Sequence, residues 1–511
     1  MTEYLQVVEN TLEKLFAKTF LIITISIILG LIIRIYFTPW NLPLNSPDAI
    51  IIMIEGLAYT KGDFTYFTPR FLWPAFNSIF FMFFNFDNNF GYASIMRIVT
   101  ISVSVATIPI VYLVSKKIVK KKYALLATIL FTIEPNLVEN SIFSISESMF
   151  IFLGLIAFYF AMQKNDKYLL FAFLFAGLSF DTRLNGIVLF IVVVYSCLTR
   201  IKTKRTWVII LIGLCIFVAI SSNHIIHPLL NETPLFPIIA NTVDTISNER
   251  SNVSTYEVDS LNILSNALKN ELLHILRISI PYLFVLFPIG VIISLTNLNN
   301  QTKLVFVAII TTLAIAIPQY TMSNEYRNLF FLTPFLCIFS VIGIQKLVEK
   351  VDMKNIFLIL LVAGLILLSA NFLKDRYDID ENYFLEKDDF GKYVVNNFEG
   401  NIAGNMRLEI IRNIPDMQLD SKFYNEKMAF FDPGTRIDSI PQLMKFSKEN
   451  NIDYFIIEEY VLQKYYPVFD EILMDKNQYV YLEEVFDSGS LDYKKLKAKI
   501  FKINWSEYND I

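Results

Sequence analysis

The stretch SIMRIVTISVSVATIPIVYLVSKKIVKKKYALLATILFTIEP, residues 94–135, decides the fold class of this chain. It contains an apolar run over 94–115, a loop with five lysines over Lys116–Lys122, and a second apolar run over 123–135. A helix that crosses a bilayer needs about 20 mostly apolar residues, and short loops rich in Lys and Arg stay in the cytoplasm. The stretch therefore predicts two membrane helices joined by a cytoplasmic loop.

The composition of the whole chain agrees with this prediction. Of its 511 residues, 54% are hydrophobic and only 18% are charged, whereas soluble domains carry about 25% charged residues. These proportions exclude a soluble globular enzyme, a disordered chain and a disulfide-stapled secreted domain. The three cysteines lie in apolar runs and are expected to be small core residues.

Nine further apolar runs extend the pattern, which gives about eleven predicted membrane helices and a mostly α, polytopic membrane protein. The short runs at 123–135 and 168–180 are expected to be buried, broken or tilted helices. The eleven predicted segments are 17–37, 94–115, 123–135, 146–163, 168–180, 184–199, 206–222, 278–296, 304–320, 328–345 and 355–373.

The basic loops orient these helices. With a cytoplasmic N-terminus, loops such as Lys116–Lys122 and Arg200–Arg205 stay in the cytoplasm. We therefore expect a multi-pass protein of the cell membrane with two large outer loops, 38–93 and 223–277. The expected domains are a membrane domain over 1–374 and an extracytoplasmic domain over 375–511.

The C-terminal segment differs in composition from the rest. Residues 375–511 carry a net charge of −10, and the preceding residues carry +6. This balance gives no basis for nucleic-acid binding. The runs Asp453–Glu458, Tyr479–Val485 and Ala498–Ile503 are typical of strands and Ile440–Asn450 of a helix, so we predict a small α/β domain. In the first outer loop, the Phe-rich run 71–86 is predicted to be a helix that lies along the membrane interface.

Ionisable side chains gather at the predicted outer helix ends. Single residues of this kind often only snorkel to the interface. Several are arginines, which run against the positive-inside bias and bind phosphate in a bidentate manner. The group suggests a site for a lipid-linked phosphate beside carboxylates. Its members are Asp48, Arg70, Arg97, Glu134, Glu139, Glu147, Asp181, Arg183, Glu325 and Arg327.

Five short motifs that contain some of these residues occur in an order that resembles the GT-C superfamily of membrane glycosyltransferases. The resemblance is to the branch of dolichyl-phosphate-mannose protein mannosyltransferases and the lipid A aminoarabinose transferase in particular. The resemblance covers essentially the whole chain. It rests on NSPDAI with Asp48, YFTPRFLWP with Arg70, PNLVENSIFSISESMF with Glu147, TRLNG over Thr182–Gly186, and YRNLFFLTP over Tyr326–Pro334.

The chain also departs from the family. Many relatives have an Asp-Glu pair in the first loop, whereas here Ala49 follows Asp48, which puts the role of a second carboxylate in doubt. The WWDYG signature of oligosaccharyltransferase catalytic subunits is absent, which argues against transfer of a whole oligosaccharide. His224 and His227 have the spacing of a helical metal site, but no third ligand is evident and we interpret them as interfacial residues. No cofactor is expected.

The resemblance implies transfer of one sugar from a polyprenyl-phosphate donor to a protein, glycan or lipid acceptor on the outer face. An acceptor hydroxyl must lose its proton as it attacks, and Asp48 is the candidate base. Asp48 could also be the N-cap of a helix. Arg183 and Arg327, with Arg70 as a weaker third, would hold the lipid phosphate, and Glu147 would orient donor or acceptor. The partners are then the lipid-linked sugar, the acceptor and membrane lipids.

Two classes of alternative stay open. A polytopic transporter or lipid flippase would also be apolar, but transporters usually contain inverted repeats and helices broken near mid-membrane, whereas these charges gather on one face. A non-catalytic scaffold of the same fold is kept open by the single acid at Asp48.

Overall fold

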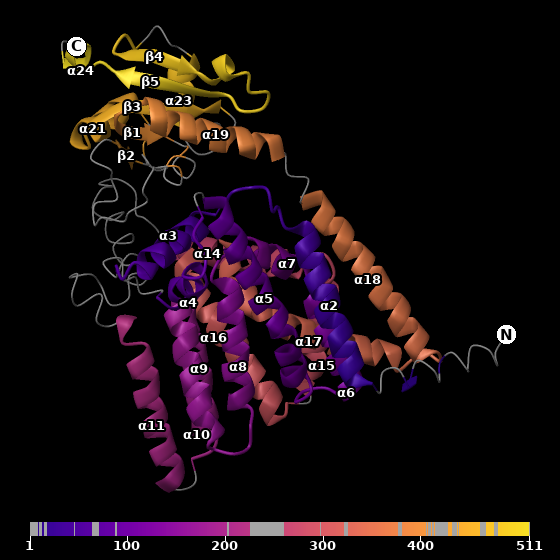
Figure 1. Cartoon of the computed structure of the whole chain (residues 1–511). Helices are drawn as coiled ribbons and strands as arrows, with labels where there is room; N and C mark the ends of the chain where they lie inside the picture. The colour runs from indigo at the N-terminus through magenta and orange to yellow at the C-terminus, as the bar shows by residue number, and fades with distance from the viewer. Residues whose placement is uncertain are drawn as a thin grey trace, which may run out of the picture. The chain divides into compact units, whose positions relative to one another are not determined.

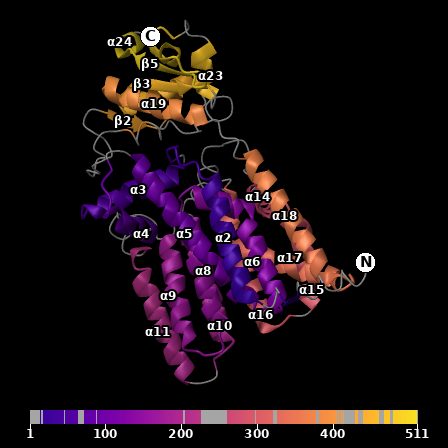
Figure 2. The same ribbon diagram turned by 45° about the vertical axis from the view of Figure 1, so that its right-hand side comes forward.

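The chain is described here by a computed structural model, drawn in Figures 1 and 2. The described residues are 18–44, 46–63, 71–86, 89–201, 204–224, 260–296, 298–320, 325–376, 381–404, 428–431, 439–459, 467–474 and 479–509, with 9, 13, 14, 406, 410, 413 and 437 singly. They divide into two compact units. One comprises 1–38, 67–77 and 95–377, and the other comprises 39–66, 78–94 and 378–511.

The first unit is helical, and each of the eleven predicted apolar segments contains a helix. Two helices that were not predicted, α7 and α14, precede α8 and α15. The helices are α2 (Thr19–Phe37), α5 (Asn89–Ser115), α6 (Lys121–Ile133), α7 (Pro135–Ile142), α8 (Glu147–Ala161), α9 (Tyr168–Thr182), α10 (Ile187–Leu198), α11 (Lys204–Ile220), α14 (Ser260–Ser279), α15 (Leu283–Thr296), α16 (Asn300–Tyr320), α17 (Thr333–Val348) and α18 (Lys354–Arg376).

The number of membrane crossings is lower by strict criteria than the predicted eleven. Among the described residues, five helices are long and apolar enough to cross a bilayer, or up to seven if each of two bent helix pairs is one span. The helices α6 and α9 to α11 have only 12 to 17 residues, and α6 is almost completely buried. The apolar helices make this a membrane protein, but the count of eleven spans is not confirmed.

Two bends interrupt the bundle. The chain bends by 120° between α7 and α8, and by 107° between α14 and α15. The predicted helix at 278–296 therefore begins later, at Leu283, because the chain turns through Pro281. Proline lacks an N–H and disfavours helical backbone in the residue before it, so a turn forms where the apolar run alone predicts a continuous helix.

Close helix approaches hold this unit together. A Cβ added at Gly290 of α15 would lie 1.7 Å from the carbonyl oxygen of Phe339 on α17. One added at Gly343 of α17 would lie 2.9 Å from the carbonyl oxygen of Leu286. Small residues that let backbones meet are a main source of helix association in membranes. In both views α11 lies beside α9, and α9 also packs against α8 and α10 (Figures 1 and 2).

One buried charge in this unit is structural. Arg34 of α2 is fully buried. Its Nε donates to Ser104 Oγ at 3.0 Å, and its Nη1 donates to the carbonyl oxygens of Gly30 at 3.1 Å and Thr132 at 3.2 Å. These bonds join α2 to α5 and α6, and they give two of the three guanidinium nitrogens acceptors inside the bundle.

The second unit contains a five-stranded mixed sheet, so the predicted C-terminal α/β fold is confirmed. The strand order is β2-β1-β3-β5-β4, with β1 parallel to β2 and β3, and β5 antiparallel to β3 and β4. The elements are α3 (Pro47–Thr60), α19 (Glu381–Asn397), β1 (Gly400–Gly404), β2 (Met428–Phe431), α21 (Ile440–Glu449), β3 (Ile452–Glu458), α23 (Pro467–Met474), β4 (Leu482–Asp487), β5 (Ala498–Ile503) and α24 (Trp505–Asn509).

Alternation along β3 gives this sheet two apolar faces. Phe455 and Ile457 pack with α21 and α23 residues such as Leu443 and Phe469. Ile456, one residue on, packs with Phe390 of α19 on the opposite face, as the two-residue period of a strand requires. The predicted strand at 479–485 starts later, at Leu482, because the N–H of Leu482 closes a turn onto the carbonyl of Tyr479.

The Phe-rich run 71–86 contains a helix, as predicted. This is α4 (Leu72–Phe81), and the apolar side chains after it are exposed, with Met82 at 63% and Phe83 at 78%. Such exposure suits a segment at a membrane interface, and that location stays a prediction.

Candidate active site

Glu147 is positioned by the bend between α7 and α8. Ser144 in this bend has a positive φ of 61°, and Ser146 occupies the N-cap position of α8. Glu147 is therefore the first residue of a new helix, where a carboxylate interacts favourably with the helix dipole. Its side chain is only 1% exposed.

Arg183 is positioned by the tight turn between α9 and α10. It is the C-cap of α9 with extended backbone, and a single 3-10 turn, η1 (Leu184–Gly186), follows. A Cβ at Gly186 would lie 2.4 Å from the backbone nitrogen of Phe180. The glycine of the TRLNG motif is thus required for the chain to reverse closely enough to place Arg183 beside α8.

Arg327 is positioned by a 3-10 helix, η2 (Tyr326–Leu332), which leads directly into α17. Pro334 lies in the first turn of α17, where its missing N–H costs no hydrogen bond. The YRNLFFLTP motif therefore forms a continuous but tightened approach to α17, and Arg327 and Asn328 project from its start.

These three turns bring Glu147, Arg183 and Arg327 together, and we call these residues the Glu147 cluster. Arg183 Nη1 lies 2.7 Å from Glu147 Oε1, and Arg327 Nη1 lies 3.7 Å from the same oxygen. The arginine side chains are 11% and 19% exposed. Three residues that the sequence places in one site thus meet in the structure, although 180 positions separate Glu147 from Arg327.

Neighbouring polar groups orient both guanidinium groups. Arg183 donates to Ser146 Oγ at 3.2 Å and to Asn328 Oδ1 at 3.4 Å. Arg327 Nη2 donates to Glu325 Oε2 at 2.8 Å. Each arginine is therefore held by a second partner besides Glu147, and its planar group keeps a defined direction.

The carboxylate of Glu147 keeps hydrogen-bonding capacity. Neither of its oxygens receives a hydrogen bond within the part of the chain that the structure describes. The 2.7 Å approach of Arg183 is an ion pair by distance, but the N–H does not point at the oxygen well enough to count as a hydrogen bond. Burying a carboxylate whose oxygens receive no hydrogen bond costs free energy unless a ligand supplies donors. Glu147 can therefore accept hydrogen bonds from the hydroxyl groups of a ligand.

The other two predicted site residues, Asp48 and Arg70, are not part of the Glu147 cluster as described. Asp48 lies in the first turn of α3, in the second compact unit. Ser46 is the N-cap of α3 and Pro47 follows it, so the interpretation of Asp48 as the N-cap is wrong. Proline strongly favours the first helical position, which moves the cap to the preceding serine. Arg70 lies outside the described residues.

Further charges near the cluster were not singled out from the sequence. The guanidinium carbon of Arg277 lies 4.0 Å above the ring of Tyr326, the neighbour of Arg327. Arg376 is paired with Glu139. Arg277 was missed because 223–277 was expected to be a loop, although His274 and Arg277 at a spacing of three indicate one helix face.

His224 lies at another polar contact on the α9 side. Its Nε2 is 3.9 Å from Asp181 Oδ1, and its ring lies 4.2 Å from that of Phe180. Asn223 donates to the same Asp181 oxygen at 3.3 Å. His227 lies outside the described residues. Among the residues that the structure describes, no three His, Cys, Asp or Glu side chains are grouped to hold a metal ion.

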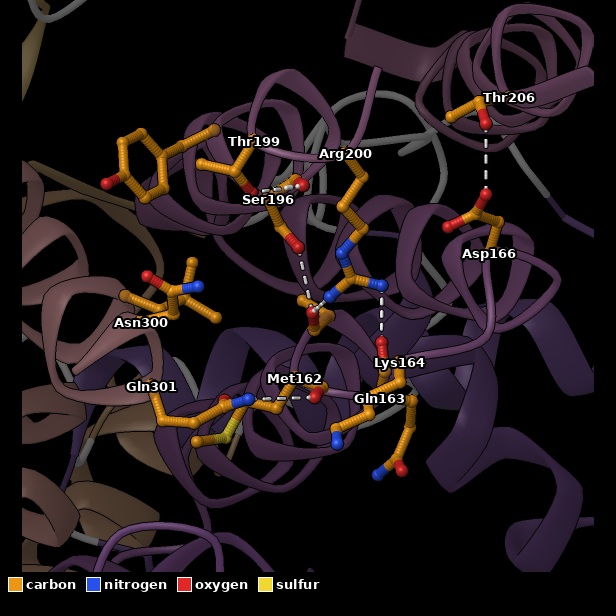
Figure 3. A pocket seen from close by; sticks show the side chains of 13 residues that line it. Met162, Gln163, Lys164, Asp166, Ser196, Thr199, Arg200, Thr206, Asn300 and Gln301 are labelled. Carbon is orange, nitrogen blue, oxygen red and sulfur yellow. Dashed lines mark hydrogen bonds between the residues drawn. The ribbon is translucent and has the colours of Figure 1, made fainter. Parts of the chain in front are cut away.

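A separate cavity of about 500 Å³ lies at the other end of α8, lined by the ends of α8 and α10 and the starts of α11 and α16 (Figure 3). Arg200 in its wall donates to the backbone carbonyl oxygens of Ala161 and Gln163. Thr206 donates to Asp166 at 3.0 Å. Arg200 thus satisfies carbonyl groups at the C-terminus of α8, a structural role, and the cavity does not compete with the Glu147 cluster as a reaction site.

Comparisons with known proteins place the fold. A family model described as "Predicted membrane protein (DUF2079)" matches residues 75–417. No curated protein sequence matches the chain. Among solved structures, the apo oligosaccharyltransferase AglB of Archaeoglobus fulgidus is similar, with 10% identity, a TM-score of 0.59, and coverage of 86% of this chain and 69% of that one.

A second solved structure is similar to this chain over nearly the whole length of both proteins. Apo ArnT from Cupriavidus metallidurans has 10% identity and a TM-score of 0.51, covering 94% of this chain and 97% of that one. Its complex with undecaprenyl phosphate gives 11% identity and a TM-score of 0.53 over the same shares. AglB has also been solved with an inhibitory peptide and a dolichol-phosphate. Because both are GT-C glycosyltransferases, the predicted resemblance to the GT-C fold is confirmed.

Proposed function

We propose a glycosyltransferase activity for this chain, which belongs to the family described as predicted membrane proteins (DUF2079) and has the GT-C fold. The chain would move one sugar from a polyprenyl-phosphate donor to a protein, glycan or lipid acceptor on the outer face of the membrane. Complexes of the similar structures with dolichol-phosphate and undecaprenyl phosphate support a donor of this class.

The Glu147 cluster is the observation that carries the proposal. Two arginines, 11% and 19% exposed, flank a buried carboxylate that has unused hydrogen-bond acceptors. A guanidinium group can donate two parallel hydrogen bonds to two oxygens of one phosphate, and a carboxylate accepts hydrogen bonds from hydroxyl groups. The same few ångströms therefore offer donors for a phosphate and acceptors for a sugar or an acceptor substrate.

In the proposed sugar transfer, the arginines would act on the leaving phosphate. The acceptor oxygen forms a bond to the anomeric carbon, and the bond from that carbon to the phosphate oxygen breaks. The leaving group changes from a phosphate diester to a monoester, so negative charge grows on its oxygens. Arg183 and Arg327 would stabilise that charge, which counts most in a site poor in water. Arg70 stays a weaker third candidate for this role.

The proton of the acceptor hydroxyl goes to a carboxylate, and we propose Asp48 as this base. Glu147 is better suited to orient donor or acceptor. If Glu147 took the proton, the largely buried Arg183 would lose the carboxylate 2.7 Å away, and breaking a buried ion pair is strongly destabilising. No metal or other cofactor enters this scheme.

Transfer can be separated from transport in one assay. The purified chain is placed in proteoliposomes with radiolabelled mannosyl- or glucosyl-phosphoundecaprenol and a membrane extract as acceptor source. We expect label to move to the acceptor fraction with release of undecaprenyl phosphate, and no release without the protein. Movement of the intact glycolipid between leaflets would instead support a transporter. Absence of both outcomes would support a non-catalytic scaffold.

The proposed orientation has its own test. The N-terminus and the Lys116–Lys122 loop would be cytoplasmic, and residues 375–511 would form an extracytoplasmic domain, separate from the membrane domain over 1–374. With the exposed Cys215 replaced by serine, Val480→Cys, at a position 70% exposed, should react with a membrane-impermeant maleimide in intact cells. Lys120→Cys should react only after permeabilisation. The reverse pattern would overturn the orientation.

A further inference from the structure

Helix α14 presents its leucines outward and its titratable residues inward. Leu272 is 65% exposed, whereas Glu271 and His274 are each only 5% exposed. The spacing of three residues places Glu271 and His274 on one face. Exposed leucines suit a lipid-facing surface, and ionisable residues turned into a membrane bundle usually mark a functional site.

The inward face of α14 meets α16 and η2. The ring of His274 lies 4.9 Å from that of Tyr320 at the end of α16, and 6.4 Å from that of Tyr326 in η2. Arg277, one turn further along α14, covers the other ring, Tyr326, at 4.0 Å. A row of three aromatic rings thus leads from α14 and α16 to the segment that carries Arg327.

Two polar groups, one on the inward face of α14 and one in this row of rings, are buried without hydrogen bonds to the residues that the structure describes. They are Oε1 of Glu271 and the hydroxyl of Tyr320, which is 4% exposed, and neither has a partner among the described residues. The burial of an acceptor and a hydroxyl without partners costs free energy that a ligand with hydroxyl groups would recover.

The chemistry of these groups differs from that of the arginines. A carboxylate repels a phosphate but accepts hydrogen bonds from neighbouring hydroxyls, a phenol both donates and accepts, and aromatic faces pack against apolar C–H surfaces. We propose that Glu271, His274 and Tyr320, the α14 subsite, recognise the hydroxyl groups of the sugar that the lipid phosphate carries. The inference rests on the proposed function, because it assumes a lipid-linked sugar donor.

The subsite and the phosphate site can be tested separately by binding. The full-length protein in nanodiscs is titrated with undecaprenyl phosphate and with its glucosyl, mannosyl and galactosyl derivatives. The wild type should bind at least one glycosyl form more tightly than undecaprenyl phosphate. Glu271→Gln should weaken that form by about ten- to a hundredfold, the value of a charged hydrogen bond. Its affinity for undecaprenyl phosphate should stay within about twofold of wild type.

Two further variants keep the test decisive. Tyr320→Phe removes only the hydroxyl and should weaken the same glycosyl lipid by about five- to tenfold, which also serves if Glu271→Gln does not fold. Glu349→Gln is the matched control, because this glutamate is exposed and pairs with Lys346 at the C-terminal end of α17, whereas η2 leads into the N-terminal end of that helix. It should bind every lipid as the wild type does.

The outcomes separate the two proposals. Equal weakening of both lipid types by Glu271→Gln, no effect on either, or no preference of the wild type for any glycosyl form would overturn the α14 subsite. A wild type that fails to bind undecaprenyl phosphate at all would overturn the proposed function instead.

Discussion

Asp48→Asn is expected to remove most sugar transfer, with a fall in turnover of about 10²- to 10⁴-fold, the usual contribution of a general base. Asparagine has nearly the same shape but cannot take the proton from the acceptor hydroxyl. Asp48 lies in the first turn of α3, after the N-cap residue Ser46, so the loss of its charge near the helix dipole should cost about 0.3–1 kcal/mol of stability. Initial rates in proteoliposomes and thermal unfolding measure the two effects.

A matched substitution guards this experiment against a general effect of charge removal. Asp63 follows the C-terminal end of α3, and its backbone N–H closes the turn onto the carbonyl of Ala58. Asp63→Asn should therefore transfer sugar at close to the wild-type rate. If Asp48→Asn also does so, Asp48 is not the base, and Glu147 becomes the carboxylate to examine.

Lysine in place of Arg183 or Arg327 is expected to lower kcat/KM by about a hundredfold or more, although the charge is kept. Arg183 lies within 3.4 Å of Glu147, Ser146 and Asn328 at once through its two terminal nitrogens. A lysine presents one ammonium group and cannot reproduce this planar arrangement or a paired contact with phosphate. Steady-state kinetics with the lipid-linked sugar measure the loss.

Arg200→Lys is the control for a structural arginine. Arg200 contacts backbone carbonyls at the opposite end of α8 (Figure 3), so its replacement should lower the unfolding temperature and leave kcat/KM of the remaining folded protein nearly unchanged. Full activity in both Arg183→Lys and Arg327→Lys would show that these residues serve packing rather than phosphate binding.

The sequence predicted the helices well and their bends poorly. A long apolar run requires a helix in a bilayer because every backbone group must be satisfied internally, and all eleven runs contain one. The bend of 107° before Leu283 is set by Pro281 and by packing, which the hydropathy of 278–296 does not register. The strands β1 and β2 were missed because GNIAG and MAFF are short, and glycine weakens the strand pattern in the first.

The site residues that could be predicted from the sequence are ionisable residues within or beside apolar runs. Glu147, Arg183 and Arg327 stand out as ionisable residues at apolar helix ends, and they meet in the structure. Glu271 and Arg277 did not stand out, because polar residues are frequent in α14 and the helix was expected to be a loop. Only the burial of Glu271 and the stacking of Arg277 on Tyr326 distinguish them from ordinary surface charges.

The pairing of Glu147 with Arg183 also bears on biosynthesis. The two residues belong to consecutive helices, α8 and α9, which pack against each other, so their ion pair is internal to one helical hairpin. A hairpin that neutralises its own charges enters a bilayer at a lower cost than either helix with a lone charge. Arg327 is synthesised 144 residues after Arg183. The hairpin can therefore insert with one matched pair, and Arg327, which brings Glu325 as its own partner 2.8 Å away, reaches the site only when η2 and α17 join the bundle.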